Sequence, residues 1–182
     1  MITLTVEQLQ KCMPALKQAK AAEYLPFLQK AMDEAGINTK LRIAAFLAQL
    51  GHESGDFRWM EEIWGPTDAQ KRYEPPTTLA TKLGNTQKGD GYRYRGRGPI
   101  QLTGRTNYKT AGTALGVDLE KDPDQARTLS VCFRVAAWFW TTRKLNALAD
   151  TGDFDGITKR INGGFNGKPD RDKRYSNCLK VL

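Results

Sequence analysis

The pattern of apolar and polar positions predicts a mostly helical chain. Amphipathic spacing predicts helices over residues 5–19 and 21–35, and Gly36 is a suitable stop for the second. The next run, LRIAAFLAQL at 41–50, is apolar on nearly every side, so we expect a buried central helix there. Further helices are predicted towards the end of the chain, over residues 107–115, 123–143, 153–161 and 169–181.

The middle of the chain has a different amino-acid composition. Residues 64–98 are rich in Pro, Gly, Thr, Lys and Arg, which predicts extended loops. Alternating apolar and polar positions in YRYRG and IQLTG predict two short strands that form a small β-hairpin element. The predicted fold class is therefore mainly α, with a small β-hairpin element and a long irregular loop region. Such a long loop inside a compact domain is usually functional or disordered.

Length and composition narrow the class of protein. A chain of 182 residues with 40% apolar and 26% charged residues suits one soluble globular domain, 1–182, in which 1–36 form N-terminal helices. No apolar segment is long enough to cross a bilayer, and the N-terminus does not look like a secretory signal. The three cysteines are far apart and His52 is the only histidine, so we expect no metal site, no cofactor and no Ser-His-Asp triad.

The net charge of +8 should attract the protein to polyanions, such as nucleic acids, anionic membranes or bacterial envelopes. The loop YRYRGRG interleaves arginine, glycine and tyrosine, which would also suit binding to single-stranded nucleic acid. No nucleic-acid-binding fold signature accompanies it, so a nucleic-acid partner is not expected. A non-catalytic basic module that binds a cell wall or nucleic acid stays as an alternative.

The stretch GHESGDF places a carboxylate, Glu53, at the end of the apolar helix. The negative end of the helix and a desolvated setting both favour the protonated form, which a general acid requires. By position alone, Glu53 could equally be a solvated residue just past the helix. Glu61, Glu62 and Glu74 follow and could supply an ionised partner. Paired carboxylates are the chemistry of glycosidases, and inverting enzymes keep them about 6.5 to 9.5 Å apart to accommodate water.

Several motifs occur together at characteristic separations. HESG is followed by LGNTQKGDGYRYRGRGPIQLTGRTNY, GVDLEKDPD, AAWFW and INGG. From about residue 41 to the end, this pattern resembles the family 19 chitinase-like glycoside hydrolases, most closely the short phage and prophage endolysins. The resemblance implies a lysozyme-like helical fold with a substrate cleft between helical lobes. It makes residues 37–182 a chitinase-like core, with no separate wall-binding domain.

The resemblance also implies catalytic roles. Such enzymes cleave β-1,4 linkages of N-acetylhexosamine polymers with inversion, and Glu53 matches the general acid. Glu62 matches the general base of the endolysin pattern, whereas the longer separation in plant-type members leaves Glu74 as an alternative. Thr103 matches a residue that positions the attacking water, although an exposed β hydroxyl is also a common surface feature.

Further residues match substrate-binding positions of the family. Gln101 and Asn107 match sugar contacts, and Asn162 matches a substrate-binding Asn that could equally be the C-cap of a helix. Arg171 matches an arginine expected to hold the base carboxylate by a bidentate pair. Aromatic side chains in or beside the loops could pack against sugar rings, namely Trp59, Trp64, Tyr92 and Tyr94.

Two polymers suit this chemistry. Chitin is neutral, whereas peptidoglycan carries acidic peptide stems, so the positive charge favours peptidoglycan. Nothing in the sequence suggests more than a monomer, and we expect no stable membrane insertion. The resemblance to endolysins implies that the protein would stay in the host cytoplasm until a holin opens the inner membrane, then reach the periplasm and cell wall. The predicted function is therefore a muramidase-like lysin, with a chitinase as the alternative.

Overall fold

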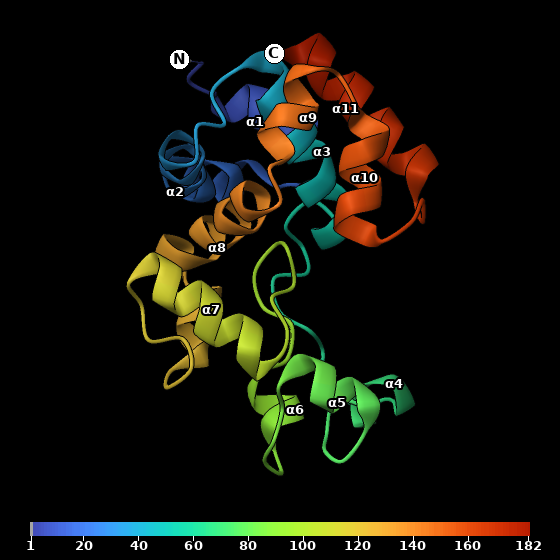
Figure 1. Cartoon of the computed structure of the whole chain (residues 1–182). Helices are drawn as coiled ribbons and strands as arrows, with labels where there is room; N and C mark the ends of the chain where they lie inside the picture. Colours follow the sequence, from blue (N-terminus) through green and yellow to red (C-terminus); the bar gives the residue numbers. More distant parts are fainter. Residues whose placement is uncertain (1) are drawn as a thin grey trace.

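The computed structural model describes residues 2–182 and is mainly helical (Figure 1). In chain order they are α1 (Val6–Cys12), α2 (Gln18–Glu34), α3 (Lys40–Ser54), α4 (Asp68–Lys71), α5 (Thr78–Leu83), α6 (Asp90–Arg93), α7 (Arg105–Leu115), the 3-10 helix η1 (Pro123–Arg127), α8 (Leu129–Thr142), α9 (Leu145–Asp150), α10 (Phe154–Asn162) and α11 (Lys168–Val181). The predicted mainly α class is confirmed.

The apolar helix α3 is central, as predicted. It begins at its N-cap Thr39, whose hydroxyl accepts a hydrogen bond from the Arg42 N–H, and it buries most of its length. The helix continues to Ser54, so Glu53 lies inside its last turn rather than beyond it. Gly55 then ends the helix with a φ of 58°, in the left-handed region. Helix α11 packs along α3 and brings the end of the chain to the candidate site.

Two long helices predicted from periodicity are interrupted. The predicted helix 5–19 is α1 alone, because Pro14 lacks an N–H and disfavours helical backbone in the residue before it. The predicted helix 123–143 is divided at Thr128, which has extended backbone with a ψ of 146° and separates η1 from α8. The short helix α9 was not predicted at all.

The long excursion in the middle is more ordered than predicted. Three short helices, α4, α5 and α6, lie within residues 64–98 and form the part of the molecule drawn in green in Figure 1. The predicted β-hairpin is not confirmed, because Arg97 forms only isolated antiparallel bridges, to Glu61 and to Leu102. Glycines at 96, 98 and 104 and Pro99 prevent longer strands from forming.

Two apolar clusters support this arrangement. The larger one lies among α1, α2, α3 and α8 to α11 and includes the buried rings of Phe46, Phe133 and Trp140. The smaller one includes Tyr94, Leu102 and Tyr108, with Val131 and Val135. Helix α8 contributes to both clusters. All three cysteines are buried free thiols, and none of the helices in residues 2–182 is long and apolar enough to span a membrane.

Helix α7 is flanked by two glycines that differ in backbone region and in packing. Gly104, its N-cap, has a φ of 91°, and a Cβ there would lie 2.8 Å from both Cβ and O of Leu83. Gly116, its C-cap, has a φ of 69°, and a Cβ there would meet nothing within 4 Å. We expect Gly104→Ala to lower the free energy of unfolding by about 1–3 kcal/mol more than Gly116→Ala, measured by urea denaturation. Equal losses would contradict this packing.

A buried carboxylate near the excursion predicts a pH dependence of stability. Burial alone would raise the pKa of Asp90, but hydrogen bonds from Arg105 and from the backbone N–H groups of Gln87 and Thr86 hold that pKa below its ordinary value. The stabilisation is complete above the unfolded pKa of about 4 and is lost as the pH falls through the lower folded pKa. In urea titrations, the stability difference between the parent and Asp90→Asn should therefore shrink from about pH 6 to about pH 3. A constant difference would refute this.

Candidate active site

Glu53 is held by a buried cation from the far end of the chain. Arg171 Nη2 donates to Glu53 Oε1 at 2.6 Å, although the Arg171 side chain is only 2% exposed. Arg171 also donates to Gln49 Oε1 and, through Nε, to the Asn166 carbonyl at 3.1 Å. Gln49 in turn donates to Thr158 Oγ1 at 2.9 Å. The guanidinium is therefore fixed from several sides and fixes Glu53.

This pairing corrects one expectation. Arg171 was expected to hold the base carboxylate, but it contacts the candidate acid because α11 packs along α3. Its positive charge stabilises negative charge on Glu53, which opposes the effect of the helix end. Within residues 2–182, no hydrogen bond is made to Glu53 Oε2. The arrangement thus orients the carboxyl group through one oxygen and leaves the other available for a reaction.

Glu62 has a different environment. Its Oε2 accepts a hydrogen bond from the Gly96 N–H at 2.9 Å, and its Oε1 accepts one from Gln70 Nε2 at 3.0 Å. Burial, followed by the negative charge of Glu62, raises the pKa of the neighbouring Tyr73 hydroxyl. Glu62 is therefore a carboxylate held by neutral donors, without an ion pair in the described part of the chain.

Gly96 brings three predicted site residues together. A Cβ on this glycine would meet Gln101 Oε1 and would lie 3.3 Å from Thr103 Oγ1, so both groups lie beside the glycine whose N–H binds Glu62. Thr103 Oγ1 donates to the Gln101 carbonyl at 2.9 Å, which leaves its lone pairs free to accept. Asn107 Nδ2 donates to the Thr103 carbonyl at 2.7 Å and supports this turn.

Gln101 connects this cluster to the segment that follows Glu53. Its backbone has a φ of 54°, in the left-handed region, and its Nε2 donates to the Trp59 carbonyl at 3.2 Å. The Trp59 N–H donates to the Ser54 carbonyl at 2.8 Å. A short path of hydrogen bonds therefore joins the end of α3 that carries Glu53 to the cluster around Glu62.

The other acids have structural partners. Glu74 Oε2 accepts from the Gly89 N–H at 2.8 Å, and Gly91 packs against the same side chain. Glu61 pairs with Arg95 and lies 3.6 Å from Arg97 Nε and 3.4 Å from Arg127 Nη1. Two of the arginines in YRYRGRG are thus committed to ion pairs, so the loop does not present three free cations to a nucleic acid.

The aromatic and amide side chains that were predicted to contact sugars differ in their exposure and hydrogen bonding. Tyr94 is 1% exposed, and its hydroxyl donates to the Glu120 carbonyl at 3.0 Å, so it packs inside the smaller cluster and cannot stack on a sugar. Trp59 and Tyr92 are about half exposed. Asn162 ends α10 before Gly163, which has a φ of 75°, and its Nδ2 is buried without a hydrogen-bond partner in residues 2–182. An unsatisfied buried donor of this kind suits a residue that binds a ligand.

Some participants were missed from the sequence. Gln49, Gln70 and Gly96 hold the two carboxyl groups but belong to no recognised catalytic pattern. Gln70 had a local signal, since Thr67 and Gln70 form a capping box at the start of α4. No group of three or more His, Cys, Asp or Glu side chains in residues 2–182 is arranged to hold a metal ion.

Comparison with known proteins identifies the family of this chain. The model of the chitinase class I family matches residues 17–151. The chain belongs to glycoside hydrolase family 19. A Haemophilus influenzae protein named as containing a glycosyl hydrolase family 19 domain is 36% identical, over 79% of this chain and 82% of its own length. Arabidopsis thaliana endochitinase At2g43610 is 44% identical over 71% of this chain, which spans 42% of that enzyme.

Solved structures of family 19 enzymes have the same fold. Chitinase C from Streptomyces griseus matches with a TM-score of 0.76 and 25% identity, covering 98% of this chain and 76% of that one. A bacterial family 19 chitinase matches with a TM-score of 0.77 at 24% identity, covering 99% and 95% of the two chains. The protein is therefore a glycoside hydrolase with the lysozyme-like family 19 fold. Asn162 and Arg171 lie beyond the residues matched by the family model.

The two candidates for the base of this family 19 hydrolase have different contacts. Glu62 lies in the Gly96 cluster with Thr103, whereas Glu74 is bound by the Gly89 N–H. We expect Glu62→Gln to lower kcat for glycosidic bond cleavage by about 10²–10⁴-fold, because a general base is lost. Glu74→Gln should lower kcat less than about 10-fold, because its contacts are structural. A larger loss for Glu74→Gln would reverse the assignment.

Proposed function

We propose that this family 19 hydrolase cleaves the β-1,4 bonds of bacterial peptidoglycan by an inverting acid and base mechanism. The observation that carries the proposal is the unequal environment of two carboxyl groups. Glu53 is oriented by a buried guanidinium with one oxygen left uncontacted, whereas Glu62 is bound by a backbone N–H and an amide. Unequal environments of this kind separate the acid from the base.

In this mechanism Glu53 donates its proton to the glycosidic oxygen as the bond from that oxygen to the anomeric carbon breaks. The uncontacted Oε2 is the oxygen that would carry the proton. As the proton leaves, negative charge develops on Glu53 next to Arg171, 2.6 Å from its Oε1. Arg171 therefore stabilises the transition state more than the protonated ground state, which is the condition for faster chemistry.

The water attacks from the other face of the sugar ring. Glu62 removes one proton from it, and the water oxygen bonds to the anomeric carbon with inversion. Thr103 already donates its hydroxyl hydrogen to the Gln101 carbonyl, so its oxygen would accept a hydrogen bond from the other O–H of the water, which stays on the product hydroxyl. Gln101, Asn107 and Asn162 would contact the sugars, and the Asn162 Nδ2 has an unused hydrogen to donate.

Charge supports peptidoglycan as the polymer. The chain has a net charge of +8, and some of its cations form no ion pair. Arg160 Nη1 donates to the Arg143 carbonyl at 2.9 Å, and neither arginine has a carboxylate partner in residues 2–182. Such charges attract the acidic peptide stems. As part of this proposal, the enzyme acts as a monomeric lysin that waits in the host cytoplasm and reaches the wall through holin lesions. Chitin is the second candidate, favoured by the names of the plant and Streptomyces relatives.

Mass analysis of digests would test the polymer and the acid together. With purified peptidoglycan, we expect new reducing ends on N-acetylmuramic acid, the α-anomer first, and a rate that falls as salt screens the charge. Glu53→Gln should remain folded by circular dichroism and lose about 10²–10⁴-fold in kcat. Faster cleavage of chito-oligosaccharides than of peptidoglycan would favour chitinase. A Glu53→Gln variant as active as the parent would refute the acid assignment.

A further inference from the structure

The turn that follows Glu53 has an unusual backbone. Gly55, Asp56 and Phe57 have φ values of 58°, 59° and 62°, so three successive residues lie in the left-handed region. Only glycine adopts this conformation readily, and each of the other two residues is destabilised by contact of its Cβ with the backbone. Local hydrogen bonds hold part of it, from the Asp56 N–H to the Gly51 carbonyl at 2.9 Å and from the Phe57 N–H to Ser54 Oγ at 2.8 Å, and contacts from outside the turn add to these.

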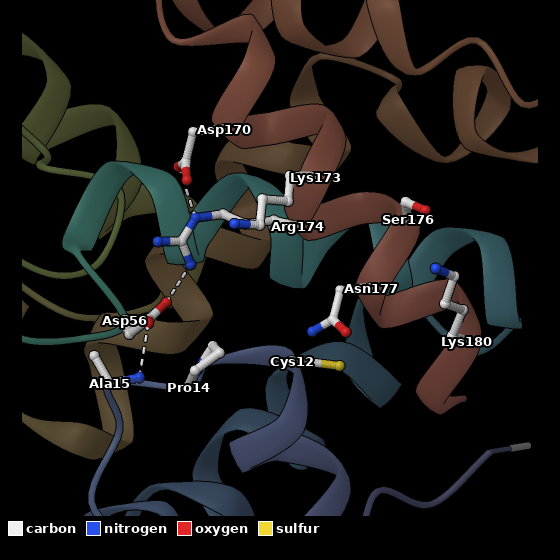
Figure 2. A pocket seen from close by; sticks show the side chains of 10 residues that line it. All are labelled: Cys12, Pro14, Ala15, Asp56, Asp170, Lys173, Arg174, Ser176, Asn177 and Lys180. Carbon is white, nitrogen blue, oxygen red and sulfur yellow. Dashed lines mark hydrogen bonds and ion pairs between the residues drawn. The ribbon is translucent and has the colours of Figure 1, made fainter.

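A buried network of charges supplies these contacts. Asp56 is 5% exposed, and its Oδ2 accepts a hydrogen bond from the Ala15 N–H at 3.0 Å. Its Oδ1 accepts one from Arg174 Nη1. Arg174 Nε then donates to Asp170 Oδ2 at 2.7 Å. Figure 2 shows this chain of contacts along one wall of a cleft of about 480 Å³ between the α1–α2 connection and α11.

The network continues to the residue before the acid. Asp170 Oδ2 lies 2.7 Å from His52 Nδ1. Helix α11 thus contacts the last turn of α3 and its C-cap turn through Asp170 to His52, Arg171 to Glu53, and Arg174 to Asp56. The fit is close, because a Cβ on Gly51 would lie 2.9 Å from Arg174 Nη1.

We propose that Asp56 and Arg174 are positioning residues for Glu53. Arg171 fixes one oxygen of the carboxyl group, but the place of the Glu53 backbone depends on the left-handed turn that Asp56 and Arg174 hold. Neither residue would touch the substrate. Their loss would move the carboxyl group relative to the glycosidic oxygen, and displacement of a catalytic group by about 1 Å can cost on the order of 10²-fold in rate. This inference rests on the proposed role of Glu53 as the acid.

The chain offers a matched set of variants. Arg174→Gln removes the charge, Arg174→Lys keeps it, and Lys173→Gln removes an exposed charge that lines the same cleft and forms no ion pair in the described residues. At a temperature where circular dichroism shows every variant folded, Arg174→Gln should lower kcat by about 10–100-fold with KM within about twofold. Arg174→Lys should recover part of the loss, and Lys173→Gln should match the parent.

Asp170→Asn decides the question if Arg174→Gln does not fold. The Asp170 side chain is 48% exposed, so its neutralisation leaves no buried unpaired carboxylate while it weakens the contacts to His52 and Arg174. Here kcat should fall about 3–10-fold at unchanged KM. If Arg174→Gln and Asp170→Asn are both folded and both keep the parental kcat, the proposal is overturned. If Arg174→Gln is unfolded, a parental kcat in Asp170→Asn alone overturns it.

Glu53→Gln separates this inference from the proposed function. If Glu53→Gln is inactive while folded Arg174→Gln and Asp170→Asn are fully active, only the positioning role fails. If Glu53→Gln keeps parental activity, the acid assignment fails and the positioning role fails with it.

Discussion

The contact between the last turn of α3 and the first turn of α11 is the constraint on which the candidate site depends. It joins Glu53 to Arg171 across 118 positions of the chain, and the arginine is almost completely buried. A buried guanidinium is stable only with its donors satisfied, and here a carboxylate, an amide oxygen and a carbonyl satisfy them. Folding and the orientation of Glu53 are therefore achieved by the same set of contacts.

The second carboxylate is held by different means. Glu62 relies on a main-chain N–H and an amide, beside Gly96, where an added Cβ would meet the end of the Gln101 side chain. Glu53 thus has an ionic partner, whereas Glu62 has only neutral donors. For Glu53 the sequence indicated only the helix end and burial, and the structure adds the buried cation of Arg171.

The sequence predicted best what depends on local pattern. Periodicity and caps predict the apolar helix α3, the glycine that ends it, and the helices α7, α10 and α11. The four- to six-residue helices of the excursion were missed because so short a segment has no clear period. Arg171 was recognised, but its partner was not, since that depends on how α11 packs. The sequence placed Tyr94 in a loop. Its burial was not predicted because it depends on tertiary packing against Tyr108.

Helix α8 has a further consequence, because it belongs to both apolar clusters. The larger cluster carries α3 with Glu53, and the smaller one adjoins the turn around Gly96 that binds Glu62. Any hinge motion between these halves would have to break close-packed contacts along α8. The positions of Glu53 and Glu62 are therefore coupled through the packing of one helix, so a substitution that loosens α8 would disturb both carboxyl groups.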